Sequence, residues 1–209
     1  MMPDIEHPWE RIYQQDQWPQ QDPVPLFHEV LPALQSRNCH RILDLGCGNG
    51  NYLVPFTEKG FDMIGADIAP TGLNISRRRL ASATMPVSLV QCDFRLPLPF
   101  RQSSFDGIWS VQSIHHARID KIRLVIQELW RVLTLNGFMI VSVAGGLDDE
   151  YAYKEIEPGT YVPREGPERG LPHHIFTEDE VREAFKMFTI EAVYARLNGK
   201  IRVILASKR

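Results

Sequence analysis

Three kinds of side chain in this sequence have the chemistry and the spacing to form a binding site. Glycine occupies alternate positions in the run Asp44-Leu45-Gly46-Cys47-Gly48-Asn49-Gly50, and acids end two later apolar stretches at Asp67 and Asp93. Histidine pairs lie at 115–116 and 173–174. Glycine allows a sharp turn and a close approach of ligand to backbone. Carboxylates accept charge-assisted hydrogen bonds, and imidazoles transfer protons or bind metals. These groups predict a site for a polar ligand.

The spacing of the glycines distinguishes between classes of nucleotide-binding turn. A dinucleotide fingerprint requires a further glycine at position 51, which is Asn51 here. No Gly-Lys-Ser/Thr sequence follows the turn, which excludes a phosphate-binding P-loop. Binding of a pyrophosphate is therefore disfavoured, and a nicotinamide-dependent oxidoreductase is only an outside alternative.

These residues fall at the ends of apolar, β-branched runs that alternate with amphipathic stretches of helical period. The pattern predicts strands at 41–45, 62–67, 87–92, 105–111 and 138–143, and helices at 26–35, 51–59, 71–81 and 120–133. Such alternation is typical of an α/β fold with a doubly wound, mostly parallel sheet and helices on both faces. Right-handed crossovers then place the ligand crevice at the carboxyl ends of the strands.

The end of the chain departs from this alternation. Thr177 and Glu180 form the pattern of a capping box, which predicts a helix through Met187. Two β-rich runs, 189–196 and 201–206, are joined across Asn198-Gly199, a strong signal for a hairpin. The sequence therefore predicts a seven-stranded sheet completed by a C-terminal antiparallel hairpin.

The length and composition predict one domain. The 209 residues are 44% hydrophobic and 23% charged, the balance of a globular protein. We divide the chain into an N-terminal cover segment and helix (1–36), a cofactor-binding core (38–145), a substrate-side loop (146–173), and a helix with the terminal hairpin (174–209). The stretch 145–173 holds five glycines and four prolines, which favours a long functional loop.

Charge and cysteine usage exclude several classes of function. The formal net charge of -3 gives no basic surface for nucleic acid or for an anionic membrane. Three scattered cysteines, without a Cys-x-x-Cys pair, favour neither a disulfide framework nor a thiolate metal site. The N-terminus lacks the apolar region of a signal peptide, and no apolar run approaches the ~20 residues that span a bilayer. We expect a cytoplasmic protein without membrane or nucleic-acid partners, and its oligomeric state stays open.

The glycine turn resembles the first motif of the class I S-adenosylmethionine-dependent methyltransferases, specifically their type 11 and type 25 domains. Further features resemble the family in the same order: the acids at Asp67 and Asp93, the stretch Pro97-Leu98-Pro99-Phe100 before Phe105-Asp106, and the stretch 128–137. The resemblance covers about residues 38–145. It implies the Rossmann-like methyltransferase fold, S-adenosylmethionine as cofactor and S-adenosylhomocysteine as product.

The resemblance also implies a role for each cofactor-binding residue. In the family the acid before the turn and the turn itself hold the methionine moiety. The acid after the second strand binds the ribose, and the acid after the third strand reaches the adenine amino group. The end of the fourth strand is where donor and acceptor meet. We therefore expect the cofactor to contact Asp44, Gly46, Cys47, Gly48, Asp67, Ile68, Asp93, Phe94 and Ser110.

On the acceptor side, His115 and His116 are the candidate general bases, because they follow the fourth strand. Adjacent side chains point in different directions, so we expect at most one to face the acceptor. The second pair, with His173, matches no standard zinc spacing, and no metal is predicted. Aromatic residues near the N-terminus and the 145–173 loop are expected to cover the crevice. The predicted substrate-side residues are Tyr13, Trp18, Gln112 and His173.

Three functions follow from these features. The preferred one is in-line transfer of a methyl group to a small-molecule acceptor. The second follows from the glycine turn and Ile114-His115-His116, which resemble the tRNA wobble-uridine carboxymethyl methyltransferases. The third is a non-catalytic module that only binds S-adenosylmethionine. The identity of the acceptor, and whether it is methylated on O, N, S or C, is not encoded in any pattern recognised here.

Overall fold

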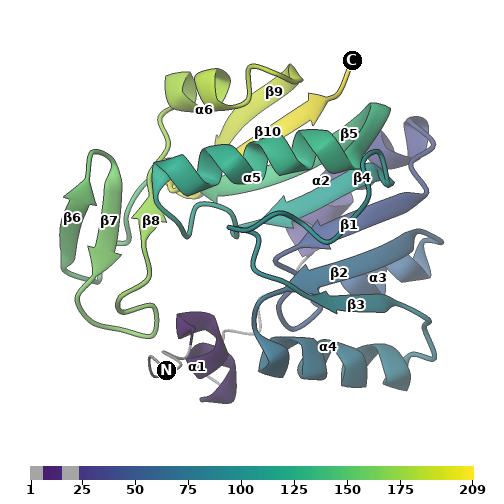
Figure 1. The fold of residues 1–209 in the computed structure, drawn as a ribbon, viewed down its shortest axis with the longest axis horizontal. Helices are drawn as coiled ribbons and strands as arrows, with labels where there is room; N and C mark the ends of the chain where they lie inside the picture. Colours follow the sequence, from purple (N-terminus) through teal and green to yellow (C-terminus); the bar gives the residue numbers. More distant parts are fainter. Residues whose placement is uncertain (1–6, 16–23) are drawn as a thin grey trace.

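The computed structural model describes residues 7–15 and 24–209. A twisted sheet of seven strands crosses the molecule (Figure 1), in the order β3-β2-β1-β4-β5-β10-β9. The first five of these strands in the chain run parallel, and β10 pairs antiparallel with both β5 and β9. The predicted fold class is confirmed. The strands are β1 (Arg41–Leu45), β2 (Asp62–Asp67), β3 (Ser88–Gln91), β4 (Phe105–Val111), β5 (Leu133–Ala144), β9 (Thr189–Arg196) and β10 (Ile201–Ser207).

Helices cover both faces of this sheet. The helices are α1 (Pro8–Gln14), α2 (Val24–Ser36), α3 (Leu53–Glu58), α4 (Pro70–Ser82), α5 (Ile119–Val132) and α6 (Glu178–Ala184). Helices α5 and α6 pack on one face around Ile108 and Val141, whereas α2, α3 and α4 pack on the other around Trp109 and Ile140. Because both faces are buried, the central strands are continuous apolar runs rather than alternating ones.

Local signals placed most of these elements correctly. The predicted bounds of β1, β2, β4 and β9 agree with the structure. Gly60, expected to stop α3, has φ +87°, and Thr177 forms the predicted capping box with Glu180. The predicted start of α5 at Asp120 was wrong, because its N-cap is Arg118. The Glu157 carboxylate accepts the N–H of Ile119 at 2.9 Å, so a distant acid satisfies the first turn.

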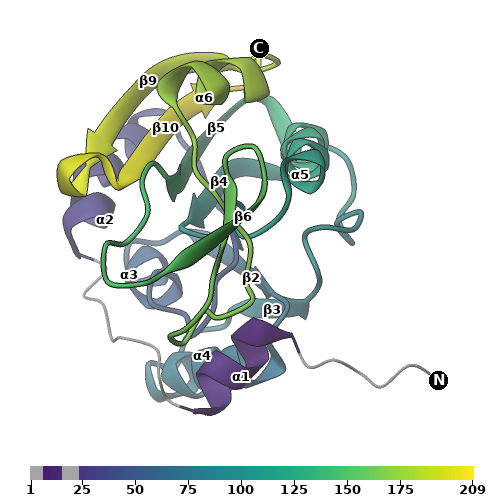
Figure 2. The same ribbon diagram turned by 90° about the vertical axis from the view of Figure 1, so that its left-hand side faces the viewer.

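The region expected to be a long loop contains a second sheet. Strands β6 (Tyr153–Glu157), β7 (Thr160–Pro163) and β8 (His173–His174) pair antiparallel in that order. Gly159 makes the tight turn between β6 and β7 with φ +75°. The strands are short and only partly buried, so they show no alternation that sequence reasoning could detect. Figure 2 shows this β6–β8 unit in front of the ends of the central strands.

Helix α1 lies between the β6–β8 unit and α4 (Figure 1). The Glu10 carboxylate accepts the N–H of Thr71 at 3.0 Å, and the Thr71 hydroxyl donates to it at 2.5 Å. On the other side, the Arg11 guanidinium donates to the carbonyls of Pro167 and Arg169, at 3.5 and 3.2 Å. Polar contacts therefore hold α1 at the carboxyl ends of the parallel strands.

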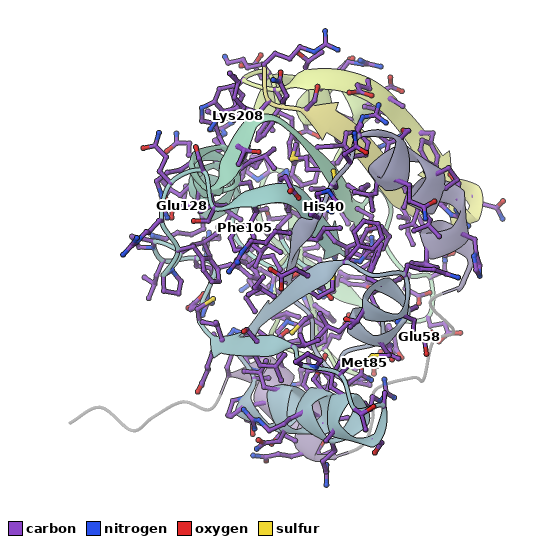
Figure 3. The ribbon with its side chains drawn as sticks, turned by 90° about the vertical axis from the view of Figure 1, so that its right-hand side faces the viewer. His40, Glu58, Met85, Phe105, Glu128 and Lys208 are labelled. Carbon is purple, nitrogen blue, oxygen red and sulfur yellow. The ribbon has the colours of Figure 1, made fainter. Side chains whose placement is uncertain are left out.

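The opposite, amino edge of the sheet is visible in Figure 3, where Glu128, Phe105 and Lys208 are labelled. The Glu128 carboxylate accepts the N–H of Leu98 at 2.7 Å and pairs with Arg131. The Lys208 ammonium donates to the carbonyls of Trp130 and Leu133, each at 2.7 Å. The expectation that 128–137 serves packing agrees with these contacts.

Candidate active site

The turn after β1 is shaped by glycines in the left-handed region. Gly46, Gly48 and Gly50 have φ of +81°, +51° and +79°. A Cβ added to Gly46 would lie 2.0 Å from the Ser113 Oγ. The amide N–H groups of Gly46 and Cys47 both donate to the Ala66 carbonyl on β2, at 2.7 and 3.1 Å. These contacts keep the turn in an open conformation near the end of β4. Only glycine permits this geometry.

This turn forms the floor of a pocket at the carboxyl edge. Its walls come from α1, the ends of β1, β2 and β4, and the segment after β3. The residues that line it are Trp9, Tyr13, Asp44, Leu45, Gly46, Cys47, Gly48, Asn49, Asn51, Tyr52, Ala66, Asp67, Ile68, Cys92, Phe94, Val111, Gln112 and Ser113. Seven of the nine predicted cofactor residues are among them.

Asp44 stands out because its carboxylate is buried without full hydrogen bonding. The side chain is 2% exposed, and its Oδ2 has no hydrogen-bond partner among the described residues. Burial, and secondly the charge of Asp67, raise the pKa of Asp44 well above its usual value. Such an atom has an unmet need for a donor, and a cationic or N–H group in the pocket would supply it.

Asp67 at the end of β2 already uses its carboxylate to order the turn. Its Oδ2 accepts the N–H of Gly48 and its Oδ1 accepts that of Ala69, both at 2.8 Å. Burial raises its pKa, while the two amides oppose that shift. Ile68 lies beside it in the pocket wall. The predicted ribose-binding acid thus lies at the pocket and shapes the backbone of the turn.

Two predicted cofactor residues lie outside the pocket. Asp93 binds Arg95 with both carboxylate oxygens, the closest contact being 2.7 Å, because Arg95 folds back over the turn two residues later. Ser110 is fully buried within the sheet, and its hydroxyl donates to the Leu45 carbonyl at 2.9 Å. Ser110 therefore ties β4 to β1, while Val111, Gln112 and Ser113 form the wall expected from it.

Tyr13, predicted on the substrate side, lines the pocket. It packs on the glycine turn, because its hydroxyl oxygen is 2.1 Å from where a Cβ on Gly48 would be. The Asn49 amide hydrogen-bonds to this hydroxyl, and burial raises the pKa of Tyr13. Tyr13 therefore contacts the part of the pocket predicted to bind the cofactor. Trp18 falls outside the described residues.

Gln112 lies in the pocket wall, as the prediction for the acceptor side required. Its backbone has φ +50°, and its side-chain amide donates to the Ser142 hydroxyl at 3.1 Å. This conformation ends β4 and turns the chain into the segment that carries the first histidine pair. A change of backbone direction at this point is what separates the histidines from the alternation of the strand.

The two histidine pairs come together, which the sequence did not indicate. The ring centroids of His115 and His116 are 3.9 Å apart, and that of His173 is 4.7 Å from His116. Both members of the first pair therefore face the same cluster, and the expectation that they diverge was wrong. Residues 113–116 form a turn, closed by the His116 N–H donating to the Ser113 carbonyl, so strand alternation does not apply.

Burial keeps these imidazoles neutral. His115, His116 and His173 are 2%, 6% and 8% exposed. Desolvation is the first cause that lowers the pKa of each, and the neighbouring histidines add to it for His115 and His116. The Trp9 ring covers the cluster through an edge-to-face contact with His116, its centroid 4.9 Å away. Because Trp9 also lines the pocket, the cluster adjoins the pocket beneath α1.

Comparison with known proteins connects this pocket to a family. Residues 42–137, from β1 to the start of the apolar part of β5, match the family described as a methyltransferase domain. Residues 42–137 of this chain belong to the S-adenosylmethionine-dependent methyltransferase family. The cofactor of the family is S-adenosylmethionine, and the open turn and the unpartnered Asp44 oxygen fit its amino-acid end, which carries an ammonium group.

Relatives of known sequence act on different acceptors. The mouse tRNA (carboxymethyluridine(34)-5-O)-methyltransferase is 35% identical over 130 residues, which is 62% of this chain and 18% of that protein. The 27-O-demethylrifamycin SV methyltransferase of Amycolatopsis mediterranei is 29% identical over 149 residues, which is 64% of this chain and 52% of that protein. The chain thus spans about half or less of the length of these curated relatives.

Solved structures share the fold over nearly the whole chain. The 1,6-didemethyltoxoflavin-N1-methyltransferase of Burkholderia thailandensis, solved with its substrate and S-adenosylhomocysteine, has a TM-score of 0.71 and 21% identity. The match covers 95% of this chain and 84% of that one. A methyltransferase of Methanosarcina mazei gives a TM-score of 0.72 at 22% identity, covering 90% of this chain and 99% of that one.

Several pocket residues were missed by sequence reasoning. Asn49 and Asn51 are polar positions within the glycine turn, so their place in the motif could have identified them. Ser113 could not be found in this way, because only the turn after β4 brings it to the pocket, whereas Trp9 is one of the N-terminal aromatic residues expected to cover the crevice. Among the described residues, no helix is long and apolar enough to span a membrane.

Proposed function

We propose that this protein transfers the methyl group of S-adenosylmethionine to a small molecule held between the cofactor pocket and the histidine cluster. The bound cofactor supplies a methyl group already activated on a sulfonium. The protein therefore has mainly to align the acceptor with it, an effect of up to about 7–11 kcal/mol when the geometry is good. Gln112 and Ser113 lie where such an acceptor would approach.

The observation that carries this proposal is the acidic cover over the carboxyl edge. Segment 145–173 has seven acidic and three basic side chains. Its strand β8 carries His173, whose ring contacts His116, and the Trp9 ring that covers His116 also lines the pocket. A polyanion such as RNA needs cationic contacts that release its counterions. An acidic cover repels it, while a small neutral or cationic acceptor is accepted.

Cations beside this cover and on α1 are already engaged with the protein. Arg118 pairs with Glu157 at 2.9 Å, and Lys200 pairs with Asp149 at 3.1 Å. Arg11 donates to backbone carbonyls of the segment before β8. These groups hold the cover in place, and binding a phosphate with them would require giving up those contacts.

We further propose how the pocket residues divide the cofactor. Asp44 and the amides of the glycine turn hold the amino-acid end. Asp67 accepts from the ribose hydroxyls, each charge-assisted bond contributing about 1.5–3 kcal/mol. Ile68 and Phe94 flank the adenine with apolar surfaces. The adenine role expected of Asp93 stays a prediction, and its carboxylate pairs with Arg95 in this structure.

The role of His115 and His116 toward the acceptor stays a prediction. Their neutral rings beside the pocket support a role as acceptors of a proton or hydrogen bond from the substrate. Burial of the Cys47 thiol raises its pKa, which disfavours a thiolate nucleophile in the same pocket.

The second candidate, a tRNA methyltransferase, is favoured by the similarity to the mouse tRNA enzyme. The third, a binding module without turnover, would keep the cofactor pocket alone. Incubation with methyl-labelled S-adenosylmethionine, a panel of metabolites and, separately, tRNA that carries unmethylated carboxymethyluridine distinguishes the three. We expect label in a small molecule. Label in tRNA alone would establish the second candidate, and cofactor binding without transfer to either class would favour the third.

A further inference from the structure

The histidine cluster has the composition of a metal site. His115 and His116 come from the turn after β4, and His173 comes from β8, 57 residues later in the sequence. Each offers one ring nitrogen, and these three nitrogens lie within 4.8 Å of one another. A tetrahedral ion with metal–nitrogen distances of about 2.0–2.1 Å requires nitrogens about 3.4 Å apart. Small side-chain rotations are enough to reach that geometry.

The hydrogen bonds around the cluster leave lone pairs available. The His116 Nδ1 lies 3.1 Å from the Ser113 carbonyl, which can only accept, so this nitrogen carries the proton and Nε2 is bare. A histidine ligand commonly donates its other N–H to a carbonyl in this way. The His115 Nδ1 is buried without a hydrogen-bond partner among the described residues, and the His173 Nε2 has only the Glu168 carboxylate nearby, at 3.3 Å and without hydrogen-bond geometry. Unmet buried nitrogens of this kind call for a ligand.

We propose that His115, His116 and His173 bind a divalent transition-metal ion of the zinc type. Three neutral imidazoles suit such an ion, and a three-histidine set leaves a fourth position open. The Glu168 carboxylate adds negative charge at the cluster, its Oε2 lying 3.3 Å from the His173 Nε2. This differs from the sequence-based expectation of no metal, which considered only the spacing of ligands along the chain.

The neighbouring His174 in the same strand lies outside this three-histidine group, although its Nε2 is also buried without a hydrogen-bond partner among the described residues. Its Nδ1 lies 2.7 Å from the Thr160 hydroxyl, and that hydroxyl in turn donates to Glu157 at 3.0 Å. His174 thus braces the β6–β8 unit against the start of α5. His173, one residue earlier, points instead to the other pair. The two residues provide a matched comparison of ligand and non-ligand.

The open position of the ion would face the pocket, because Ser113 and Trp9 belong to the pocket wall and also contact His116. A hydroxyl or carboxylate of the acceptor could then bind the ion and be oriented by it. The histidines would act on the acceptor through the ion rather than as free bases. This role rests on the proposed function, whereas ion binding itself does not.

The test is metal binding by tag-free protein without cofactor or acceptor. After treatment with a chelator, Zn²⁺ binding is measured by calorimetry and by elemental analysis, and Co²⁺ is added to record its visible spectrum. We expect one ion per chain with nitrogen ligation. The variants His173→Gln and His115→Gln should bind at least about tenfold more weakly, whereas His174→Gln should bind as the unaltered protein does. Circular dichroism verifies that each variant folds.

Three results would overturn the proposal. One is absence of stoichiometric binding at micromolar Zn²⁺. A second is binding through thiolates, seen as sulfur-to-cobalt charge-transfer bands in the unaltered protein, which needs no variant to interpret. Equal affinity of the His173→Gln and His174→Gln variants would also exclude the site. None of these outcomes bears on methyl transfer, so failure of the metal site and failure of the proposed function remain distinguishable.

Discussion

At the amino edge of the sheet, the buried and half-buried charged groups have all found partners inside the protein. Asp106 accepts the N–H groups of His40 and Arg41, each at 2.8 Å, and Lys208 donates to two carbonyls. At the carboxyl edge, Asp44 Oδ2 and His115 Nδ1 are buried without such partners. Both edges are built from the same strands, but in the described part of the chain only the carboxyl edge has a buried carboxylate oxygen without a partner.

This difference teaches which end of the sheet is built for a ligand. A charged group buried with partners stabilises the fold, whereas one buried without them costs free energy of folding. The protein bears that cost only where a ligand recovers it. Substitution of a partnered group at the amino edge should therefore lower the stability and leave the ligand affinity unchanged. Substitution of an unpartnered group at the carboxyl edge should lower the ligand affinity without lowering the stability.

The largest effect is expected for Gly46→Ala. The new Cβ would collide with the Ser113 side chain and impose a left-handed φ of +81° on alanine. A displacement of the turn by about 1 Å can cost on the order of 100-fold, so the Kd for S-adenosylmethionine should rise at least about 100-fold by calorimetry. Gly60→Ala is the matched control, with φ +87° but nothing near its Cβ. It should cost about 1 kcal/mol of stability and leave the Kd unchanged.

Asp44→Asn should separate stability from binding. Loss of one charge-assisted hydrogen bond of about 1.5–3 kcal/mol should raise the Kd for the cofactor roughly tenfold or more. The apo protein should become more stable at pH 7, because the folded state raises the pKa of Asp44 by burial. The free-energy cost of ionising Asp44 in the folded protein is absent below the unfolded pKa of about 4 and grows as the pH rises. The gain in melting temperature should therefore vanish near pH 4. A variant less stable at pH 7 would contradict the proposed cost of Asp44.

Glu128→Ala should show the reverse pattern at the amino edge. The Leu98 N–H and Arg131 lose their acceptor, which should cost about 1–3 kcal/mol in urea unfolding at pH 7 without changing the cofactor Kd. Hydrogen bonds from Arg131 are the largest cause that lowers the pKa of Glu128 in the folded state. The contribution of Glu128 to stability is present at pH values above its pKa in the unfolded state. It is lost as the pH falls through the pKa of Glu128 in the folded state. The difference between the two proteins should hence shrink below about pH 4.

The smallest effect is expected for Ser110→Ala. Ser110 was predicted to contact the cofactor, but the structure places it inside the sheet. Removing its hydrogen bond to the Leu45 carbonyl should cost about 1 kcal/mol of stability. The Kd for S-adenosylmethionine should stay within twofold of the original, measured by the same calorimetry. A larger rise in Kd would restore Ser110 to the cofactor site and blur the division between structural and ligand-facing polar groups.

Sequence reasoning was strongest where the signal is local. The glycine turn, Asp67 and the hairpin at Asn198 each depend on a few neighbouring residues, and each lies where it was predicted. Sequence reasoning was weakest in predicting which way a side chain points. Asp93 and Ser110 have the expected positions along the chain, but Arg95 and the Leu45 carbonyl engage them. Which partner a polar group meets depends on packing that periodicity does not report.

The sequence by itself determined the order of strands and helices, the class of cofactor and the edge of the sheet that binds it, because backbone conformation and burial period are written in short stretches of residues. Only the tertiary structure decided that residues 145–173 form a second sheet, and that His173 meets His115 and His116. These contacts join segments far apart in the chain. Their free energy comes from packing and hydrogen bonds that exist only once the whole sheet has formed.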